Sequence, residues 1–349
     1  MRLTLQGTQS RTQWRQWVII LVFIGLALLL IGPSLRHMSF NVWLGAIATG
    51  LGFGFVAIGV YLSFRVLDFP DLTIDGSFPL GAAISATLIV AGVNPFLTLP
   101  IAVAGGALAG IATAVIATRL KIHSLLASIL VTTGLISINL RIMGRSNIPL
   151  LNEPTIFTRF AGPFRDLMTR IGGDQLARMS NNILAILLFL VAILVVKWLL
   201  DYFMHTEIGL TMRATGDNPQ MVRALGGSTN AMIVLGLAIS NGLVGLSGAL
   251  IAQYQGFADV NMGLGLIIAG LAAVILGETL FRPSSERAAT RAVVLGMVVY
   301  RIAIAAALTI SIPLPGGGSF SIDAQDVKLA TAVLVLAALW FTQFRKRGA

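Results

Sequence analysis

Long apolar segments separated by short polar ones repeat along almost the whole chain. An α-helix needs roughly 20 apolar residues to cross a bilayer, so the pattern predicts an all-α, polytopic membrane protein of about ten transmembrane helices. Several of the segments are short or rich in glycine, which allows one or two helices to be broken or re-entrant. The expected ranges, each good to several residues, are 17–32, 41–63, 77–93, 96–118, 122–143, 183–200, 231–252, 263–281, 290–312 and 326–343.

The expected helices fall into two groups of five on either side of a long polar segment. We interpret residues 1–349 as a single transmembrane domain, with a first half at 17–143, an extracytoplasmic loop at 144–182 and a second half at 183–343. Duplicated halves are common in transporters. Because the two halves show no clear similarity in sequence, the pattern allows an internal repeat without establishing one.

The loop at 144–182 combines a turn-rich stretch, 152–163, with a stretch of amphipathic helical character, 164–179. The second stretch is expected to form a helix on the outer membrane surface or a docking surface for an external partner. A solvated connector explains the same residues equally well.

Lysine and arginine gather in the short loops on one side of the expected bundle, and such loops face the cytoplasm. This predicts that both termini are cytoplasmic. Arg36 and the arginines of the 144–182 loop lie on the outer side, but a long loop has less weight in this rule. The apolar run 17–31 is expected to remain as the first helix, because no small-residue cleavage site follows it.

Composition supports a membrane protein. The 349 residues are 56% hydrophobic and 11% charged, whereas soluble domains carry about 25% charged residues. The net charge of +10 does not indicate nucleic acid, because the basic residues lie beside the apolar spans. There they orient the helices and meet anionic membrane lipid.

The chain lacks the motifs of common enzymes and metal sites. It has no cysteine, and His37, His123 and His205 are far apart in the sequence, so neither a metal nor another cofactor is expected. No GxxxxGK[ST] phosphate loop occurs, and no HExxH or GxSxG motif. We therefore expect a transport subunit with no catalytic residue of its own.

A short helix with its own start and stop signals lies in the expected cytoplasmic loop 201–230. Asn218 fits the N-cap and Pro219 the first helical position, so a helix is predicted at 220–225. Gly226 can adopt the left-handed conformation that ends it. A small capped helix between membrane spans, accompanied by Arg213 and Arg223, is typical of a contact with a partner protein.

Three aspartates, Asp68, Asp71 and Asp75, follow the second expected span at intervals of three and four residues. On a continuous helix they would share a face, but Pro70 interrupts any such helix. A broken helix beside a water-filled route would accommodate them. An ordinary cytoplasmic loop is an equally good interpretation.

Other polar residues lie inside the expected spans, where charge is costly and usually functional or paired. Arg301 is expected to face the bundle interior and to pair with an acid, a helix C-terminus or a carboxylated substrate. Asn139 is expected near the interface at the end of its span, and Ser240 and Asn241 are expected to form hydrogen bonds between helices. Glycine-rich runs such as 104–110 and 242–249 predict close helix packing.

The motif G-x-x-x-R-A-x-G-x-N is present as Gly209, Arg213, Ala214, Gly216 and Asn218, and a glycine-rich span follows it. This arrangement resembles the permeases of ATP-binding-cassette (ABC) importers of the branched-chain amino acid and ribose type. The stretches RVLDFPDLTIDGSFPLGA, LLASILVTTGLISINLRIMGRSNIPLL and AGLAAVILGETLF resemble the subgroup named for tryptophan and tyrosine transport. The resemblance covers 41–343 and departs at 68–75, where branched-chain amino acid permeases have an Asn-Phe-Ala-His-Gly-like stretch.

The resemblance implies a permease that translocates a small polar solute, such as an amino acid. The implied partners are a cytoplasmic ABC ATPase dimer, an extracytoplasmic substrate-binding protein and a second permease copy, with ATP hydrolysis in the separate ATPase. The helix at 218–226 is then a lever in a groove of the ATPase, and its movement rocks the bundle between two states of access. The residues expected to couple the ATPase are Arg213, Gly216, Asp217, Asn218, Pro219, Arg223 and Gly226, and those expected along the translocation pathway are Asp68, Asp71, Asp75, Arg301 and Asn139.

Two other classes of function compete with this interpretation. A secondary transporter coupled to ions or protons would use intramembrane aspartates, but it needs no docking helix for a motor. A membrane-embedded enzyme would need a nucleophile and base or a metal site, and the sequence shows neither.

Overall fold

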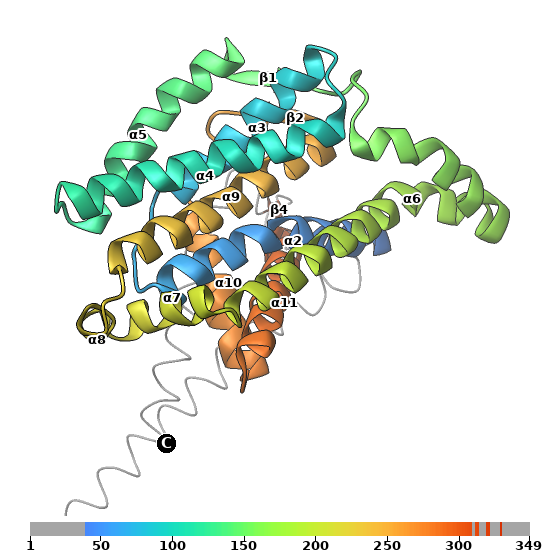
Figure 1. The fold of residues 1–349 in the computed structure, drawn as a ribbon. Helices are drawn as coiled ribbons and strands as arrows, with labels where there is room; N and C mark the ends of the chain where they lie inside the picture. The colour runs from blue at the N-terminus through green and yellow to red at the C-terminus, as the bar shows by residue number, and fades with distance from the viewer. Residues whose placement is uncertain (1–38, 309–310, 314–318, 322–328, 330–349) are drawn as a thin grey trace, which may run out of the picture.

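The structure, a computed structural model, describes residues 39–308, 311–313, 319–321 and 329, and helices dominate these residues (Figure 1). The helical elements are α2 (Phe40–Val60), the π-helix η1 (Tyr61–Val66), α3 (Ile74–Val90), α4 (Pro95–Arg119), α5 (Ser124–Met143), α6 (Ile156–Met204), α7 (Glu207–Asp217), α8 (Pro219–Ala224), α9 (Thr229–Gln255), α10 (Leu266–Phe281) and α11 (Glu286–Leu308). Two short antiparallel pairs join β1 (Asn147–Pro149) to β2 (Phe257–Asp259) and β3 (Ser311–Pro313) to β4 (Ser319–Ser321).

Six of the described helical stretches are long and apolar enough to cross a membrane: α2 with η1, α4, α5, α6, α9 and α11. Helices α3 and α10 are apolar but shorter. These eight helices lie at the eight ranges expected between 41 and 312, and six of them are long enough to span, so the chain is a helical protein of several membrane spans. The ranges 17–32 and 326–343 lie outside the described residues apart from residue 329, and the total of ten spans stays a prediction.

The expectation of a turn-rich stretch at 152–163 is wrong from Ile156 onward, where α6 begins. Thr155 caps this helix, since its hydroxyl accepts a hydrogen bond from Thr158 N over 3.2 Å. The Thr158 hydroxyl in turn accepts one from Thr155 N over 2.8 Å. This reciprocal capping box stabilises the first turn, and the buried side chains of Ile156 and Phe157 hold it against the bundle.

Helix α6 is interrupted at Gly172 and Gly173, whose backbone angles are not helical. The first part, which includes the first half of the helix expected at 164–179, extends away from the bundle in Figure 1. The second part returns along the bundle and includes the span expected at 183–200. The segment 144–182 is therefore built mainly of helix.

Helix α9 packs most extensively against α4 and α3. Glycines permit this approach: a Cβ on Gly110 would lie 2.1 Å from Leu237 O, and a Cβ on Gly248 would lie 2.0 Å from Phe78 O. Any larger residue would force these backbones apart. The prediction that the glycine-rich runs bring helices close together is confirmed.

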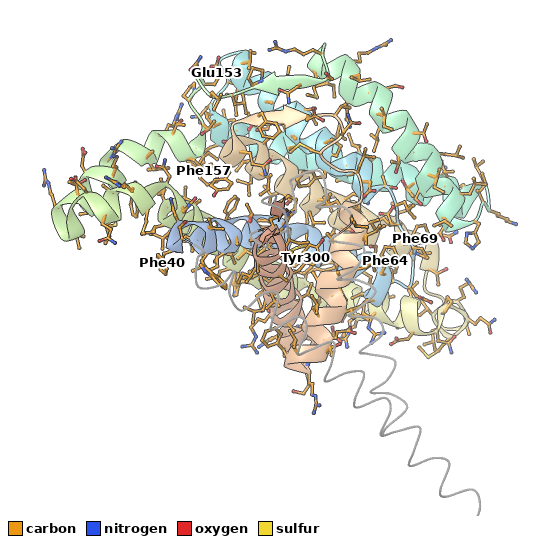
Figure 2. All side chains as sticks on the ribbon, turned by 180° about the vertical axis from the view of Figure 1, so that it is seen from behind. Phe40, Phe64, Phe69, Glu153, Phe157 and Tyr300 are labelled. Carbon is orange, nitrogen blue, oxygen red and sulfur yellow. The ribbon has the colours of Figure 1, made fainter. Side chains whose placement is uncertain are left out.

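The α2–η1 unit passes through the bundle, with Phe40 at its start and Phe64 towards its end, on opposite sides of Tyr300 in Figure 2. Ser240 of α9 donates a hydrogen bond to Gly59 O over 2.7 Å, as expected for a hydroxyl between helices. In η1 the bond from Leu67 N to Leu62 O spans five residues. Such π-helical turns often occur at functional sites.

Candidate functional site: a docking helix and a buried polar layer

Helix α8 is short and is capped by its own flanking residues. Asn218 Oδ1 accepts a hydrogen bond from Met221 N over 3.0 Å, and Pro219 is the first helical residue. Gly226 has a φ of +82°, the left-handed conformation that ends a helix. The helix predicted at 220–225 is thus confirmed at 219–224, with the expected caps.

Most of the surface of α8 is exposed. Val222 is its one buried residue, whereas Met221 is 46% exposed and Leu225, directly after the helix, is 80% exposed. Asp217 and Arg223 are exposed beside them. Large apolar side chains that are exposed among charges are typical of a surface that a partner protein covers.

Arg213 and Gly216 fasten α7 to the bundle. Arg213 Nη2 lies 2.7 Å from Glu286 Oε1 at the start of α11, and the Tyr61 hydroxyl donates to Glu286 Oε2 over 2.9 Å. A Cβ on Gly216 would lie 2.0 Å from Val66 O at the end of η1. These two members of the expected coupling set therefore contact their own chain.

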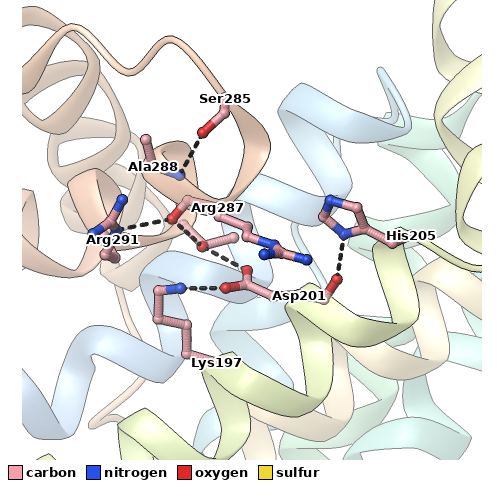
Figure 3. Close-up of polar contacts among 8 residues, drawn as sticks. Lys197, Asp201, His205, Ser285, Arg287, Ala288 and Arg291 are labelled. Carbon is pink, nitrogen blue, oxygen red and sulfur yellow. Dashed lines mark hydrogen bonds and ion pairs between the residues drawn. The ribbon is translucent and has the colours of Figure 1, made fainter.

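A second attachment joins the end of α6 to α11 (Figure 3). Lys197 and Asp201, one turn apart on α6, form an ion pair, and Thr290 of α11 donates to Asp201 Oδ1 over 2.9 Å. His205 Nδ1 lies 2.6 Å from Asp201 O. Sequence reasoning missed this cluster because no local pattern relates α6 to α11.

The three aspartates of the 68–75 stretch lie in three different environments. Residues 67–73 leave the helix, so the aspartates do not share a helical face. Asp68 is exposed and has a φ of +50°, Asp71 is fully buried, and Asp75 is partly buried in the first turn of α3.

Asp71 belongs to a buried hydrogen-bond network. Its Oδ1 accepts from Thr73 N over 2.9 Å, and its Oδ2 accepts from Asn241 Nδ2 over 2.7 Å. Asn241 Oδ1 accepts from the Ser77 hydroxyl over 2.7 Å, so Asn241 joins α9 to α3 as expected. Because Asn241 lies near the middle of α9, Asp71 lies deep in the bundle. Among the described residues, no cationic side chain forms an ion pair with Asp71.

Asp75 holds the beginning of α10. Its Oδ1 accepts from Ile267 N over 2.9 Å and its Oδ2 accepts from Gly265 N over 3.1 Å. A carboxylate is stabilised there because helix N-termini carry partial positive charge and free N–H groups. A Cβ on Gly263 would lie 2.0 Å from Asp75 O, so α3 and the α10 start are in backbone contact.

Arg301 faces the bundle interior, but its observed neighbour is a ring and not an acid. Its guanidinium carbon lies 3.7 Å from the centre of the Phe53 ring, and that ring stacks on Phe78 with centroids 5.3 Å apart. The expected pairing with an acid or a helix C-terminus is not found among the described residues, because the cation–π contact with Phe53 takes that position. The buried Nε of Arg301 has no hydrogen-bond partner.

Asn139, four residues before the end of α5, is fully buried. Its Nδ2 donates to Gly76 O over 3.3 Å, because the glycine lets α5 approach the first turn of α3. Its Oδ1 is buried without a partner. Within the described part of the chain, no three histidine, aspartate or glutamate side chains cluster as a metal site would require.

Comparisons with known proteins agree with a transport component. The family model described as "Branched-chain amino acid transport system / permease component" matches residues 43–339. The chain is 38% identical over 284 residues to the tyrosine transport system permease protein of Clostridioides difficile, an alignment that covers 81% of this chain and 85% of that one.

Two further relatives are more distant. An uncharacterised protein of Rickettsia prowazekii is 35% identical over 224 residues, which cover 64% of this chain and 72% of the relative. The autoinducer 2 import system permease protein of Photorhabdus laumondii is 28% identical over 210 residues, which cover 56% and 60%. No solved structure matches the chain.

Proposed function

Because the chain belongs to the family of branched-chain amino acid transport system permease components, it is the permease subunit of an ABC importer, and we propose how it is driven and what it carries. Its family implies ATPase and substrate-binding partners. We assign ATP hydrolysis to the separate ATPase. The gradient-driven carrier has no support among the comparisons.

The exposed surface of α8 carries the proposal. Met221 and Leu225 form the apolar part of the contact with the ATPase, and Asp217 and Arg223 form its charged part. The Arg223 guanidinium also reaches the Thr229 hydroxyl at 3.4 Å, which orients it at the edge of the helix. Arg213 and Gly216 support this contact indirectly, because they hold α7, which precedes α8, on the bundle.

The buried polar layer is proposed to border the route of the cargo. Asp71, Asp75 and Asn139 place polar groups around the start of α3, and Arg301 presents a cation from the other side of Phe53 and Phe78. Asp68 lies at the exposed end of the same stretch. A zwitterion such as an amino acid meets both signs of charge along such a route, which agrees with the tyrosine transport named for one relative.

The complete transporter is proposed to contain two copies of this chain in the bacterial inner membrane, with both termini in the cytoplasm. An ATPase dimer lies under the α8 helices, and the binding protein delivers solute from the other side. The amphipathic first part of α6, exposed at Phe160, Leu167 and Ile171, lies on that outer side, at the lipid surface or against the binding protein.

The test is co-purification of the tagged chain with its ATPase in mild detergent. Leu225→Asp should lower the amount of bound ATPase by about tenfold, because it puts a charge in the apolar centre of the contact. The matched control is Leu120→Asp, since Leu120 is 65% exposed and follows α4 at the same end of the bundle. Equal ATPase recovery with both variants, or a wild-type chain that purifies alone, would remove α8 as the docking element.

A further inference from the structure

One carboxylate, that of Glu286, joins three elements at the end of the bundle that bears α8. Its Oε1 accepts a hydrogen bond from Arg213 Nη2 of α7 over 2.7 Å, and its Oε2 accepts one from the Tyr61 hydroxyl of η1 over 2.9 Å. Glu286 is itself the first residue of α11. Each oxygen therefore bonds a different neighbouring element.

The same face of α11 is held a second time, one turn further on. Thr290, four residues after Glu286, donates to Asp201 at the end of α6 over 2.9 Å. Residues four apart lie on one face of a helix. Figure 3 shows Asp201 facing this part of α11, near Arg287. The end of α6 and α7 itself are thus both tied to the first turns of α11.

Helix α11 leads from this junction to the buried polar layer. Arg301 follows Glu286 by about four turns, roughly 22 Å along the axis of the helix. Its guanidinium lies on the ring of Phe53, in the same α2–η1 unit that carries Tyr61. Helix α11 packs along α2, and the side-chain contacts Glu286–Tyr61 and Arg301–Phe53 join it to the α2–η1 unit at two levels.

We propose that Glu286 is the positioning residue through which a displacement of α7 and α8 reaches α11, and so moves Arg301 relative to Phe53. The proposal rests on the docking of the ATPase on α8. When the ATPase displaces α8, the Arg213–Glu286 ion pair carries α11 along with α7. The Tyr61 hydroxyl, which donates to the same carboxylate, belongs to the α2–η1 unit past which α11 moves.

The small contribution of the Arg213–Glu286 ion pair to folding stability suits a positioning role. The side chains of Arg213 and Glu286 are 33% and 30% exposed, so their ion pair contributes little to the stability of the fold. Removing it should therefore leave the bundle folded and change the communication between its parts. A matched control is available in the Arg65–Glu278 pair, which joins η1 to α10 at 2.8 Å and forms no ion pair with α7 among the described residues.

Single-cysteine reporters can test this in the assembled transporter, because the chain has no cysteine of its own. Glu207→Cys places a fluorophore at the start of α7, and Leu295→Cys places one on the exposed side of α11. The permease–ATPase complex in lipid nanodiscs is measured with and without ATP, and uptake is measured in proteoliposomes. Each reporter is combined with Glu286→Ala, with Glu286→Gln, which keeps an acceptor for Tyr61, and with the control Glu278→Ala.

We expect ATP to change both signals in the wild-type background and in Glu278→Ala. In Glu286→Ala and Glu286→Gln the α7 signal should still change, the α11 signal should not, and uptake should fall about tenfold, as single changes along a coupling route do. The exchange Arg213→Glu with Glu286→Arg should restore the α11 response. An α11 signal that still responds to ATP in both Glu286 variants would overturn the proposal. A wild-type chain that binds no ATPase would instead overturn the proposed function, and this inference with it.

Discussion

At the scale of single residues, the three aspartates show that burial determines which contacts a side chain makes. Asp68, Asp71 and Asp75 lie within eight residues of each other, yet the first is exposed, the second is bonded to Asn241 and the third holds the start of α10. Spacing alone could not separate them, because Asn241 and Ile267, which bond Asp71 and Asp75, are more than a hundred residues away in the chain. Arg301 is similar, since its ring partner comes from α2.

Neutral replacements at Asp71 and Arg301 should lower uptake with little change in folding. Asp71→Asn keeps an acceptor oxygen, and Arg301→Gln keeps part of the stem that covers Phe53. If these charges contact a zwitterionic cargo, each loss should lower the rate of uptake at limiting substrate about tenfold. Uptake is measured in proteoliposomes, with Arg141→Gln at an exposed position of α5 as the control. Unchanged uptake kinetics in both variants would exclude these residues from the route.

At the scale of elements, local chemistry was predictable and long-range contact was not. The caps of α8 are Asn218, Pro219 and Gly226, all within the helix or beside it, so sequence predicted the helix almost to the residue. The start of α6 was missed, because the Thr155–Thr158 capping box outweighs the turn-forming residues around it. The sequence allows two interpretations of the non-helical stretch at 67–73. The bond from Asn241 of α9 to Asp71 decides how deeply this stretch is buried in the bundle, and no local pattern reveals that bond.

The close packing of α9 on α3 at Gly248 leads to a prediction about stability. Gly248→Ala places a methyl group where the backbone of α3 now lies, so α3 and α9 must move apart at a cost of about 1–3 kcal/mol. Gly134 of α5 is the control, since a Cβ there would meet no atom within 4 Å. Gly134→Ala should be neutral or stabilising by about 0.5–1 kcal/mol, because alanine favours a helix over glycine. Thermal unfolding in detergent measures both, and equal midpoints would contradict the packing described for α9.

At the scale of the whole molecule, the two groups of helices interlock. Helix α9, from the second group, packs against α3 and α4 of the first, and α11 packs against α2. Sequence reasoning placed these helices in order along the chain and did not reveal which ones touch. A displacement at one end of the bundle therefore reaches helices from both groups.

Transport by the complete assembly should depend on ATP and not on an ion gradient. In proteoliposomes that contain permease, ATPase and binding protein, withdrawal of ATP should abolish uptake, because the permease belongs to an ABC importer family and has no phosphate loop of its own. A protonophore should leave uptake unchanged. Uptake that continues on a proton gradient after ATP is removed would favour the secondary transporter.

The local capping of α8 has an evolutionary consequence. The helix sends one side chain, Val222, into the bundle, and its caps belong to its own loop. On the proposed docking of the ATPase at α8, substitutions on its outer surface would change the choice of ATPase without disturbing the packing of the bundle. A permease built in this way can exchange one ATPase for another over time, or share one ATPase with other permeases, while its cargo stays the same.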